Sequence, residues 1–535
     1  MGDGAGGPGQ ADGPGQPRVR LAELVAALSL GVDLGFGQPM EHVLRQCLIA
    51  LRVAERAGLA EQERAGVYYT ALLVNVGCHA DAHEQAKWFG DDIAMKSGKY
   101  AHELRSVRGM LAGMRMIGAG NPLLLRFRVG LEFAVSGHRE VDAMITQHAR
   151  LARTLAEQLG LSEQVREAVG AAYEQWDGRG WPGVLKADAI PIAARIAQLA
   201  EFTEVAYRVQ GVAGARALAR ARSGRQFDPG LAALLLAKAE DILAGLETVP
   251  AWQAVIAAEP TLAVELSAGQ LDGALTAIAN FVDLKSPFTL GHSVAVAELA
   301  AEAGRRLGLA GEKAELLRRA ALVHGFGKLG VSNSIWDRPG PLSAGEWERV
   351  RMSPYLTERM LRQSAALAPL GEIAMQHRER LDGSGYPRGL SGAAISRLAR
   401  VLGAADVYQS MREPRPHRPA RTAEDATAEL RAEVRAGRLD GDAVDAVLAA
   451  AGHRTPRRRT ALAGLTAREM EVLILLARGM SNKQIASQLV ITPKTAGNHV
   501  EHIYAKIGAS SRAAAAMFAV QHGLLPEDEI AVPVA

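Results

Sequence analysis

The sequence predicts an all-α protein made of two tandem helical modules and a small C-terminal four-helix domain. Three observations support this prediction. Aromatic residues make up only 5% of the 535 residues, and the abundance of Ala and Leu favours helices over sheets. One long unit of sequence occurs twice, as expected for repeated modules. The C-terminal segment contains capped amphipathic patterns with the helical period.

The length and the composition bound the architecture. A chain of 535 residues is too long for one hydrophobic core, so several domains are expected. Residues 1–18 are rich in Gly and Pro and contain no basic or apolar signal region. This composition predicts a disordered tail.

Cysteine usage and hydropathy indicate the compartment. The chain has two cysteines, Cys47 and Cys78, and neither has a metal-like spacing. This argues against a disulfide scaffold or a zinc finger and suits a reducing cytoplasm. No uninterrupted apolar run approaches the ~20 residues that a membrane span needs. We therefore expect a cytoplasmic protein that does not engage a membrane.

The repeated modules are identified by matching strings. The string VDL at 32–34 recurs at 282–284, and His42 recurs as His292, both displaced by 250 residues. A second register, a set of matches with a different constant displacement, lies further along the chain. Two displacements that are each kept without a gap make chance similarity improbable.

In that second register, DGRGWP from Asp177 recurs as DGSGYP from Asp382, displaced by 205 residues. The difference between 250 and 205 places 45 extra residues in the first copy, between Cys78 and His148. Together the registers predict this organisation: modules at 19–250 and 251–452, a basic linker at 453–463 and a last domain at 464–535.

The last domain contains three helices whose starts are marked by capping residues. Thr466 and Glu469 form a T-x-x-E capping box, and Ser481 and Gln484 form an S-x-x-Q box. A Thr-Pro pair at 492–493 marks the third start, because Thr is a good N-cap and Pro is favoured at the first helical position. Three capped helices in close succession indicate a compact helical domain.

The helix after the Thr-Pro pair has two distinct faces. Val500, Ile503 and Ile507 form an apolar stripe that would anchor it to its domain. From Arg454 to Arg512 there are ten Lys and Arg against three Asp and Glu, so this segment has about +7 charge while the whole chain has +3. The face opposite the stripe presents polar groups that suit base edges and phosphates of double-stranded DNA: Thr495, Asn498, His499, His502 and Lys506.

Residues 464–524 resemble the LuxR-type helix-turn-helix, through E-V-L, S-N-K-x-I-A, T-x-x-x-H and K-I-G elements and through Ser511-Arg512 ahead of an Ala-rich helix. The resemblance implies that the third helix enters the major groove, and that the protein is a homodimer on an inverted-repeat operator. Family members often carry Val-Lys where Ala496 and Gly497 stand, so one expected DNA contact is absent. The DNA contacts are expected from Ser481, Asn482, Lys483, Lys494, Thr495, Asn498, His499, His502 and Lys506.

The second module resembles the HD-GYP family of all-α metal-dependent phosphohydrolases. The match is carried by TLGHS around His292, ALVHGFGKLG around His324, HRERLDGSGYPRGLSGAAI from His377 and ARVLGAAD ending at Asp406. The resemblance implies hydrolysis of cyclic di-GMP at a centre of two or three metal ions. Such ions clamp the phosphate and activate a bridging water.

Three ligand positions depart from this family. The His-Asp doublet is His324-Gly325, so the carboxylate expected to bridge two ions is missing. A further family His is Ser353, and the His-His doublet is Gln376-His377. The remaining candidates for metal ligands are His292, His324, His377 and Asp406. The one catalytic candidate is Lys328.

Three interpretations of this second-module site stay open. Three imidazoles and a carboxylate could bind one divalent ion, such as Fe or Mn, without turnover. A working hydrolase is the second interpretation. The missing ligands favour the third, in which the polar groups are remnants of a lost site and no cofactor is bound.

The first module departs further from the family. His42 and His148 remain, but Val74-Asn75 and Ala171-Ala172 occupy the doublets, and Glu201 replaces the last Asp. Apolar side chains where ions should sit argue against a metal centre at these positions. The insertion adds an H-x-D-x-H string, either surface polarity or a metal site: His79, Asp81 and His83.

These observations lead to one main hypothesis, a transcription regulator whose degenerate phosphohydrolase-like region senses a ligand or mediates dimerisation. The rival from another class is a cyclic di-GMP phosphodiesterase with a DNA-binding output domain. A third hypothesis keeps cyclic dinucleotide binding without hydrolysis, so that the ligand shifts the population of a DNA-competent state. The sequence does not reveal the operator, the direction of regulation or the signal.

Overall fold

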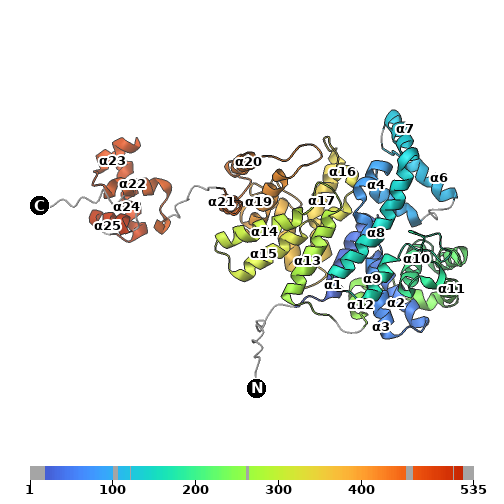
Figure 1. The fold of residues 1–535 in the computed structure, drawn as a ribbon. Coiled ribbons are helices and arrows are strands. Elements are labelled where there is room, and N and C mark those ends of the chain that lie inside the picture. The colour runs from blue at the N-terminus through green and yellow to red at the C-terminus, as the bar shows by residue number, and fades with distance from the viewer. Residues whose placement is uncertain are drawn as a thin grey trace, which may run out of the picture. The chain divides into compact units, whose positions relative to one another are not determined.

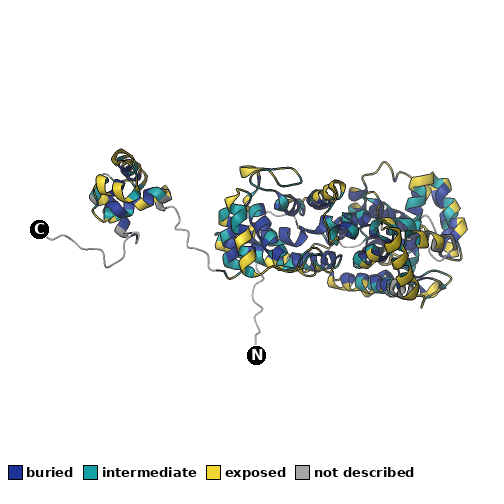
Figure 2. Cartoon of the chain, turned by 90° about the horizontal axis from the view of Figure 1, so that it is seen from above, coloured by how far each residue is buried: buried dark blue, intermediate teal, exposed yellow. Residues whose placement is uncertain are grey.

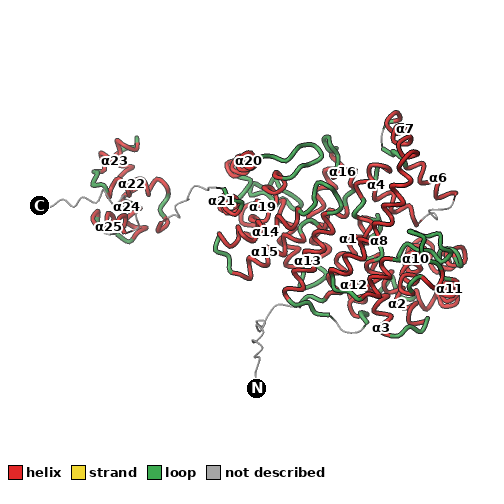
Figure 3. The backbone as a smooth tube through the Cα atoms, in the orientation of Figure 1, coloured by secondary structure: helices red, strands yellow, loops and turns green. Residues whose placement is uncertain are grey.

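The computed structural model describes residues 18–100, 107–120, 122–260, 264–453, 462–509, 511–521 and 524. Within these ranges the chain is all-α, as predicted, and β pairing is limited to four isolated bridges (Figure 3). The chain divides into two compact units, Met1–Arg454 and Thr455–Ala535. Residues 1–17 of the predicted tail and 454–461 of the predicted linker lie outside the described residues.

The first half of the larger unit consists of helices that surround the first module's site and of an insertion (Figure 1). The main helices are α1 (Leu21–Gly35), α2 (His42–Arg56), α3 (Glu61–Leu73), η1 (Val76–His79), α8 (His138–Gln158), α9 (Glu163–Gly170), η4 (Ala187–Ala189), α10 (Ile192–Arg222) and α11 (Pro229–Leu243). Helix α12 (Ala251–Ala257) lies beyond the predicted module boundary at residue 250 but packs against α2. The insertion contains α4 (Ala82–Phe89), α5 (Asp92–Ser97), η2 (Gly98–Tyr100), α6 (Val107–Met116), α7 (Leu123–Glu132) and η3 (Phe133–Gly137).

The second half repeats this order without the long insertion. Its elements are α13 (Ala268–Asp283), α14 (His292–Arg306), α15 (Gly311–Val323), η5 (Phe326–Gly330), α16 (Asn333–Trp336), α17 (Ala344–Leu361), α18 (Ala368–Met375), η6 (Gln376–Arg378), η7 (Gly392–Ala394), α19 (Arg397–Arg412), α20 (Ala423–Arg435) and α21 (Gly441–Ala450).

The two sequence registers reappear in the bounds of these helices. α14 and α15 begin and end 250 residues after α2 and α3, and α18 begins and ends 205 residues after α9. Both copies also contain a cis peptide bond at the same place, Trp181–Pro182 and Tyr386–Pro387. The repeat therefore extends to backbone geometry.

The two halves share one hydrophobic core, which extends from Val19 to Leu448 (Figure 2). A close contact between α1 and the second half depends on Gly31. A Cβ atom there would lie 2.6 Å from Met360 Cε and 2.7 Å from Leu329 Cδ1, so a larger residue would have to displace the ends of these side chains.

A buried carboxylate from the insertion joins the same two halves. Asp92 is fully buried, and its Oδ2 lies 2.9 Å from Lys96 Nζ and 3.6 Å from Lys285 Nζ. Its Oδ1 accepts hydrogen bonds from Ser332 Oγ at 2.7 Å and from the Asn333 backbone N–H at 2.8 Å. Burial acts to raise the pKa of Asp92, but Lys285 and Lys96 hold it below its ordinary value. The carboxylate therefore stays ionised inside the protein.

Helices α6 and α7 project from the rest of the larger unit (Figure 1), and α7 exposes apolar side chains. Leu123 is 84% exposed, Leu124 88% and Phe127 71%. Isolated exposed apolar residues are ordinary, but a contiguous group on one hairpin is characteristic of an interaction surface.

The smaller unit consists of η8 (Leu462–Gly464), α22 (Ala467–Ala477), α23 (Asn482–Leu489), α24 (Pro493–Ile507) and α25 (Arg512–Gln521). It has a core of its own, in which Leu473, Ile485 and Ile503 are fully buried. The predicted four-helix architecture is present. Among the described helices of the whole chain, none combines the length and the apolar character that crossing a bilayer requires.

Candidate metal centre and nucleic-acid interface

Three of the four predicted metal ligands come together in the second module. His292 begins α14, His324 follows the end of α15, and Asp406 lies within α19. One ligand atom from each lies within 4.8 Å of the other two, and all three residues are buried. No other such group of three or more His, Cys, Asp or Glu residues occurs in the described part of the chain.

Hydrogen bonds fix the orientation of both imidazoles. Glu413 Oε2 lies 2.8 Å from His292 Nδ1, and the Ala321 carbonyl oxygen lies 2.5 Å from His324 Nδ1. With Nδ1 of each ring used in this way, Nε2 is the atom available to an ion. His292 Nε2 and His324 Nε2 lie 3.2 Å and 3.6 Å from Asp406 Oδ1.

His324 Nε2 and Asp406 have the electrostatic properties of metal ligands. His324 Nε2 is buried without a hydrogen-bond partner, and burial lowers the pKa of this imidazole. Burial acts to raise the pKa of Asp406, but Arg378, whose Nη2 lies 3.0 Å from Asp406 Oδ2, helps to hold it well below its ordinary value. A neutral imidazole beside an ionised carboxylate is the state that binds a divalent ion.

The other two predicted residues lie beside this cluster. The His377 ring is 5.1 Å from the His324 ring, and its Nδ1 lies 2.6 Å from the Ala374 carbonyl oxygen, but it is outside the group of three. Lys328 is half-buried on η5, where burial lowers its pKa against the opposing effect of Asp283 and Asp406. Their proposed roles as ligand and catalytic residue stay predictions.

The missing carboxylate of the second module leaves space that Lys328 approaches. A Cβ atom built on Gly325 would lie 3.3 Å from Ser293 Oγ and 3.7 Å from Lys328 Nζ. The ammonium group is therefore next to the place where the second ion of the HD-GYP pattern would need its bridging ligand. The residues present fit one divalent ion held by His292, His324 and Asp406, because two imidazoles and one carboxylate form an ordinary three-ligand set.

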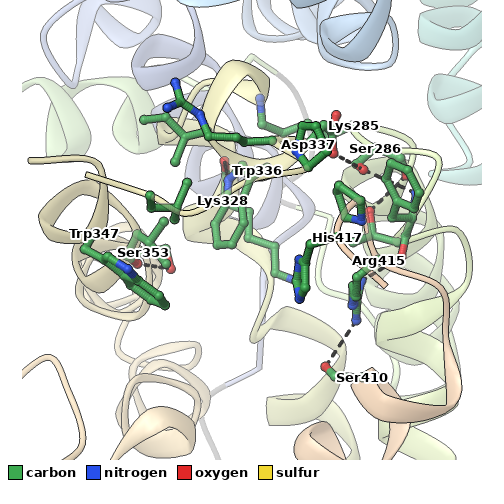
Figure 4. Close-up of a pocket in the computed structure, with 18 of the residues that line it drawn as sticks. Lys285, Ser286, Lys328, Trp336, Asp337, Trp347, Ser353, Ser410, Arg415 and His417 are labelled. Carbon is green, nitrogen blue, oxygen red and sulfur yellow. Dashed lines mark hydrogen bonds between the residues drawn. The ribbon is translucent and has the colours of Figure 1, made fainter. Parts of the chain in front are cut away.

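A cavity of about 730 Å³ opens beside the cluster and is lined by His324 and His377 (Figure 4). The lining contains one carboxylate, Asp337, and six cationic side chains. Trp336 and Trp347 also line it. A cationic cavity with aromatic walls suits a ligand that combines phosphates with planar bases. The cationic side chains are Lys285, Lys328, Arg338, Arg378, Arg415 and Arg418.

In the first module, a lysine from the insertion occupies the corresponding site. Lys99 Nζ lies 2.5 Å from Glu201 Oε1 and 2.8 Å from Asn75 Oδ1. Burial acts to raise the pKa of Glu201, but Lys99 holds it below its ordinary value. Glu201 is the residue in register with Asp406, so an internal ammonium neutralises the carboxylate that an ion would otherwise hold.

The H-x-D-x-H string does not form a cluster. His79 is fully buried, and both of its ring nitrogens lack a hydrogen-bond partner. Asp81 Oδ2 lies 2.5 Å from His148 Nε2, and His83 Nδ1 lies 2.8 Å from Asp337 Oδ2. The three side chains thus have different neighbours, and the surface interpretation is wrong for His79, because the insertion folds over it.

The predicted DNA-binding residues lie on the smaller unit. Both predicted capping boxes are present, at Thr466–Glu469 and Ser481–Gln484, and Thr492 caps α24. Ala496, Val500 and Ile503 of α24 are buried in the core of this unit, and Ile507 is partly buried. Asn482 and His499 are half-buried, and the other predicted contact residues are exposed: Ser481, Lys483, Lys494, Thr495, Asn498, His502 and Lys506.

Two of these residues also serve the fold. Lys506 Nζ lies 2.6 Å from Glu469 Oε2 and so ties α24 to the capping box of α22. Arg512 donates to Asn482 Oδ1 at 3.0 Å and to the Met480 carbonyl at 2.6 Å. No local sequence pattern predicts either pair, because the partners lie 37 and 30 residues apart. Lys506 and Asn482 stay predicted DNA contacts, with a structural role in addition.

Comparisons with known proteins agree with this architecture. Residues 138–231 and 276–443 match the HD domain, and residues 463–519 match the luxR family of bacterial regulatory proteins. Over 414 residues the chain is 32% identical to the 3'3'-cGAMP-specific phosphodiesterase 3 of Vibrio cholerae. This match covers 76% of this chain and 90% of that protein. The chain belongs to the HD-domain family. Its two HD-domain matches fall in the two sequence modules, and the luxR match falls in the smaller unit.

Other relatives cover only part of this HD-domain protein. The 3'3'-cGAMP-specific phosphodiesterase 1 of Vibrio cholerae is 39% identical over 171 residues, 32% of this chain and 40% of that protein. The cyclic di-GMP phosphodiesterase response regulator RpfG of Xanthomonas campestris is 33% identical over 177 residues, 32% of this chain and 46% of that protein. The crystal structure of V-cGAP3, a cyclic GMP-AMP specific phosphodiesterase of V. cholerae, superposes with a TM-score of 0.57 at 29% identity and covers 83% of this chain and 100% of that one.

Proposed function

We propose that this HD-domain protein is a cytoplasmic, DNA-binding transcription regulator whose HD-domain region senses a cyclic dinucleotide. The observation that carries the proposal is the contrast between the two functional regions. The polar face of α24 presents Thr495, Asn498 and His502 to solvent, whereas Gly325 and Ser353 replace two ligands of the metal centre. Regulation therefore depends on binding rather than on turnover.

The cavity next to His324 supports a cyclic dinucleotide as the ligand. Its lining contains six Lys and Arg side chains and one carboxylate, Asp337, and Trp336 and Trp347 offer aromatic surface for bases. Guanidinium groups bind phosphates through two parallel hydrogen bonds, and aromatic faces stack on bases. The relatives' names include phosphodiesterases for 3'3'-cGAMP and for cyclic di-GMP. Either compound presents two phosphates and two bases.

We further propose that the protein acts as a homodimer on an inverted-repeat operator. Helix-turn-helix units of this kind read two half-sites about one helical turn apart, and a two-fold dimer provides the second unit. The exposed apolar hairpin of α6 and α7, which includes Leu124 and Phe127, supplies a surface that a second copy would cover.

The DNA-binding part is tested by gel shift with genomic fragments at low and moderate salt. The wild type should retard specific fragments, with a steep loss of affinity as salt rises, because phosphate contacts release counterions. Asn498→Ala should weaken specific binding by about tenfold to hundredfold. Ser487→Ala, an exposed change on α23, is the matched control and should leave affinity unchanged. A wild type that retards no fragment at low salt would contradict the proposal.

The sensing part is tested by calorimetric titration of 3'3'-cGAMP and cyclic di-GMP. Arg378→Ala should abolish the heat of binding of the compound that the wild type prefers, whereas Arg435→Ala, on α20 and away from the cavity lining, should not. Saturation with that compound should change DNA affinity by the coupling free energy between the two sites. Absence of heat and of any change in DNA affinity would leave a structural scaffold instead of a sensor.

A second candidate function is phosphohydrolysis with a DNA-binding output. The His292, His324 and Asp406 group favours it, because these residues could hold a divalent ion such as Fe or Mn that supplies Lewis-acid chemistry. His324 and Asp406 would then orient the ion, and Lys328 would neutralise phosphate charge. Elemental analysis of the purified protein and assay of both cyclic dinucleotides decide between the candidates. Turnover that disappears in His324→Ala would establish hydrolysis, and less than one ion per chain without turnover would rule it out.

A further inference from the structure

The first module contains a thiol that neither proposed function uses. Cys78 lies on η1, and its Sγ is 3.5 Å from Nδ1 of His148 on α8. The Nε2 atom of the same imidazole lies 2.5 Å from Asp81 Oδ2. The imidazole of His148 therefore lies between the thiol of Cys78 and the carboxylate of Asp81, with one ring nitrogen next to each. This is the arrangement that activates a thiol as a nucleophile.

Close packing fixes this arrangement. A Cβ atom on Gly77 would lie 2.2 Å from the His148 carbonyl oxygen, so only glycine allows η1 to approach α8 so closely. Tyr173 Oη lies 2.8 Å from Cys78 Sγ. Burial raises the pKa of Tyr173 well above its ordinary value, so its hydroxyl stays protonated and can donate to sulfur.

The charges around Cys78 favour a thiolate paired with an imidazolium. Burial acts to raise the pKa of Cys78, but His148 and Lys99 hold it below its ordinary value. Burial acts to lower the pKa of His148, but Cys78 and Asp81 raise it to about 9. The thiolate is the nucleophilic form of cysteine, and a neighbouring cation is what stabilises it.

The other cysteine provides a contrast within the same chain. Cys47 is fully buried on α2, and its thiol donates a hydrogen bond to the Tyr68 carbonyl at 3.7 Å. Burial alone raises the pKa of Cys47. Cys47 is therefore an inert structural thiol.

A small cavity gives the Cys78 site room for a reactant. Its volume is about 120 Å³, and Cys78, His148 and Tyr173 line it together with Gln85. Gln85 is 2% exposed, and its Oε1 has no hydrogen-bond partner. A buried amide oxygen without a partner beside a cavity indicates a place for a small donor molecule. The volume admits a small molecule of a few heavy atoms and excludes a nucleotide.

From this geometry we propose that Cys78, with His148 and Asp81, forms a redox-sensing site in the first module that takes hydroperoxides as its oxidant. The Cys78 sulfur bonds to one peroxide oxygen while the O–O bond breaks. The leaving hydroxide, or the alkoxide of an organic hydroperoxide, takes the Nδ1 proton of the His148 imidazolium and departs as water or as an alcohol. Sulfur is oxidised by two electrons to a sulfenic acid, and the peroxide is reduced. The charge of Asp81, beside Nε2, stabilises the imidazolium.

The site is tested on the full chain by treatment with one equivalent of hydrogen peroxide at pH 7 in the presence of dimedone. Peptide mass spectrometry then quantifies the adduct at each cysteine. The wild type should form the adduct at Cys78 and not at Cys47. His148→Gln should slow adduct formation at Cys78 by at least about tenfold, because a cysteine without its cation is only a few per cent thiolate at pH 7. Asp81→Asn should slow it by a smaller factor.

Fold integrity is controlled within the same samples. Circular dichroism confirms that each variant is folded, and Cys47 must stay unreactive in the folded protein and become reactive in urea. Equal reactivity of Cys78 and Cys47, no adduct at Cys78, or an unchanged rate in folded His148→Gln would each overturn the proposal. If His148→Gln fails to fold, Asp81→Asn provides the same comparison.

Discussion

Truncating a core residue of α24 should destabilise the smaller unit without affecting the larger one. Ile503 is fully buried, with a relative exposure of 0%, and it lies in the core of the smaller unit, where it cannot contact DNA. Ile503→Ala removes buried methyl groups and leaves a cavity, which costs about 2–5 kcal/mol. A domain of this size has a free energy of unfolding of roughly 3–9 kcal/mol. The substitution therefore removes about half of its stability.

The midpoint of thermal unfolding should fall accordingly. In domains of 60–100 residues, each 1 kcal/mol lowers the midpoint by about 4–8 °C, so a loss of about 2–5 kcal/mol in Ile503→Ala should lower it by roughly 8–40 °C. All six tryptophans, at positions 88, 176, 181, 252, 336 and 347, belong to the larger unit. Tryptophan fluorescence therefore follows that unit alone, while far-UV circular dichroism follows both.

By circular dichroism, the smaller unit should unfold first, and Ile503→Ala should lower the midpoint of this early transition. The midpoint of the fluorescence transition, which reports the larger unit, should stay unchanged. DNA binding should be lost above the new midpoint. Thr495→Ala is the matched control, because Thr495 is exposed on the same helix; it should weaken DNA binding and move neither transition by more than a few degrees. A fluorescence transition that moves together with the early one, or an early midpoint unchanged by Ile503→Ala, would refute the reasoning.

The remaining predictions concern the ion site, the capping box and the exposed hairpin. Gly325→Asp restores a carboxylate at the bridging position, and the divalent ion bound per chain, measured by elemental analysis, should exceed that of the wild type; an unchanged ratio would contradict the missing carboxylate as the cause of the reduced metal site. The hydrogen bond from Lys506, with that from Thr466, lowers the pKa of Glu469 to about 2, so its contribution to stability is present above pH 4.5 and is lost as the pH falls towards 2. In Glu469→Gln the midpoint of thermal unfolding, measured by circular dichroism, should depend less on pH between 4.5 and 2. A variant whose midpoint falls with pH as steeply as that of the wild type would exclude the Glu469–Lys506 pair as the cause. Leu124→Asp should shift the molar mass measured by light scattering from dimer to monomer, and a dimer that persists removes the hairpin from the interface.

Local patterns predicted the elements that depend on neighbouring residues. The capping boxes at Thr466 and Ser481 and the start of α24 at Pro493 follow from side chains within one helical turn, so the sequence contains them completely. The repeat registers of 250 and 205 residues were equally readable, because each copy preserves its own spacing. Three of the four second-module ligands, carried by family motifs, come together in the structure.

Contacts between distant segments could not be predicted in this way. Lys99 neutralises Glu201 from 102 positions away along the chain, and Cys78 meets His148 across 70 positions. Glu413 orients His292 from 121 positions away. No motif links these partners, because their proximity results from how the insertion and α19 pack in three dimensions. Sequence patterns identified the sites, whereas the groups that set their charge required the structure.

The shared carboxylate at Asp92 has a consequence for dissecting this protein. A fragment that ends at residue 250 would retain Asp92 without Ser332, Asn333 and Lys285, and one that starts at 251 would retain these groups without their acceptor. Losing one side of a buried ionic contact typically costs about 3–5 kcal/mol. Expression of either half by itself should accordingly yield aggregated material, and useful cloning boundaries enclose both halves, from residue 18 to 453.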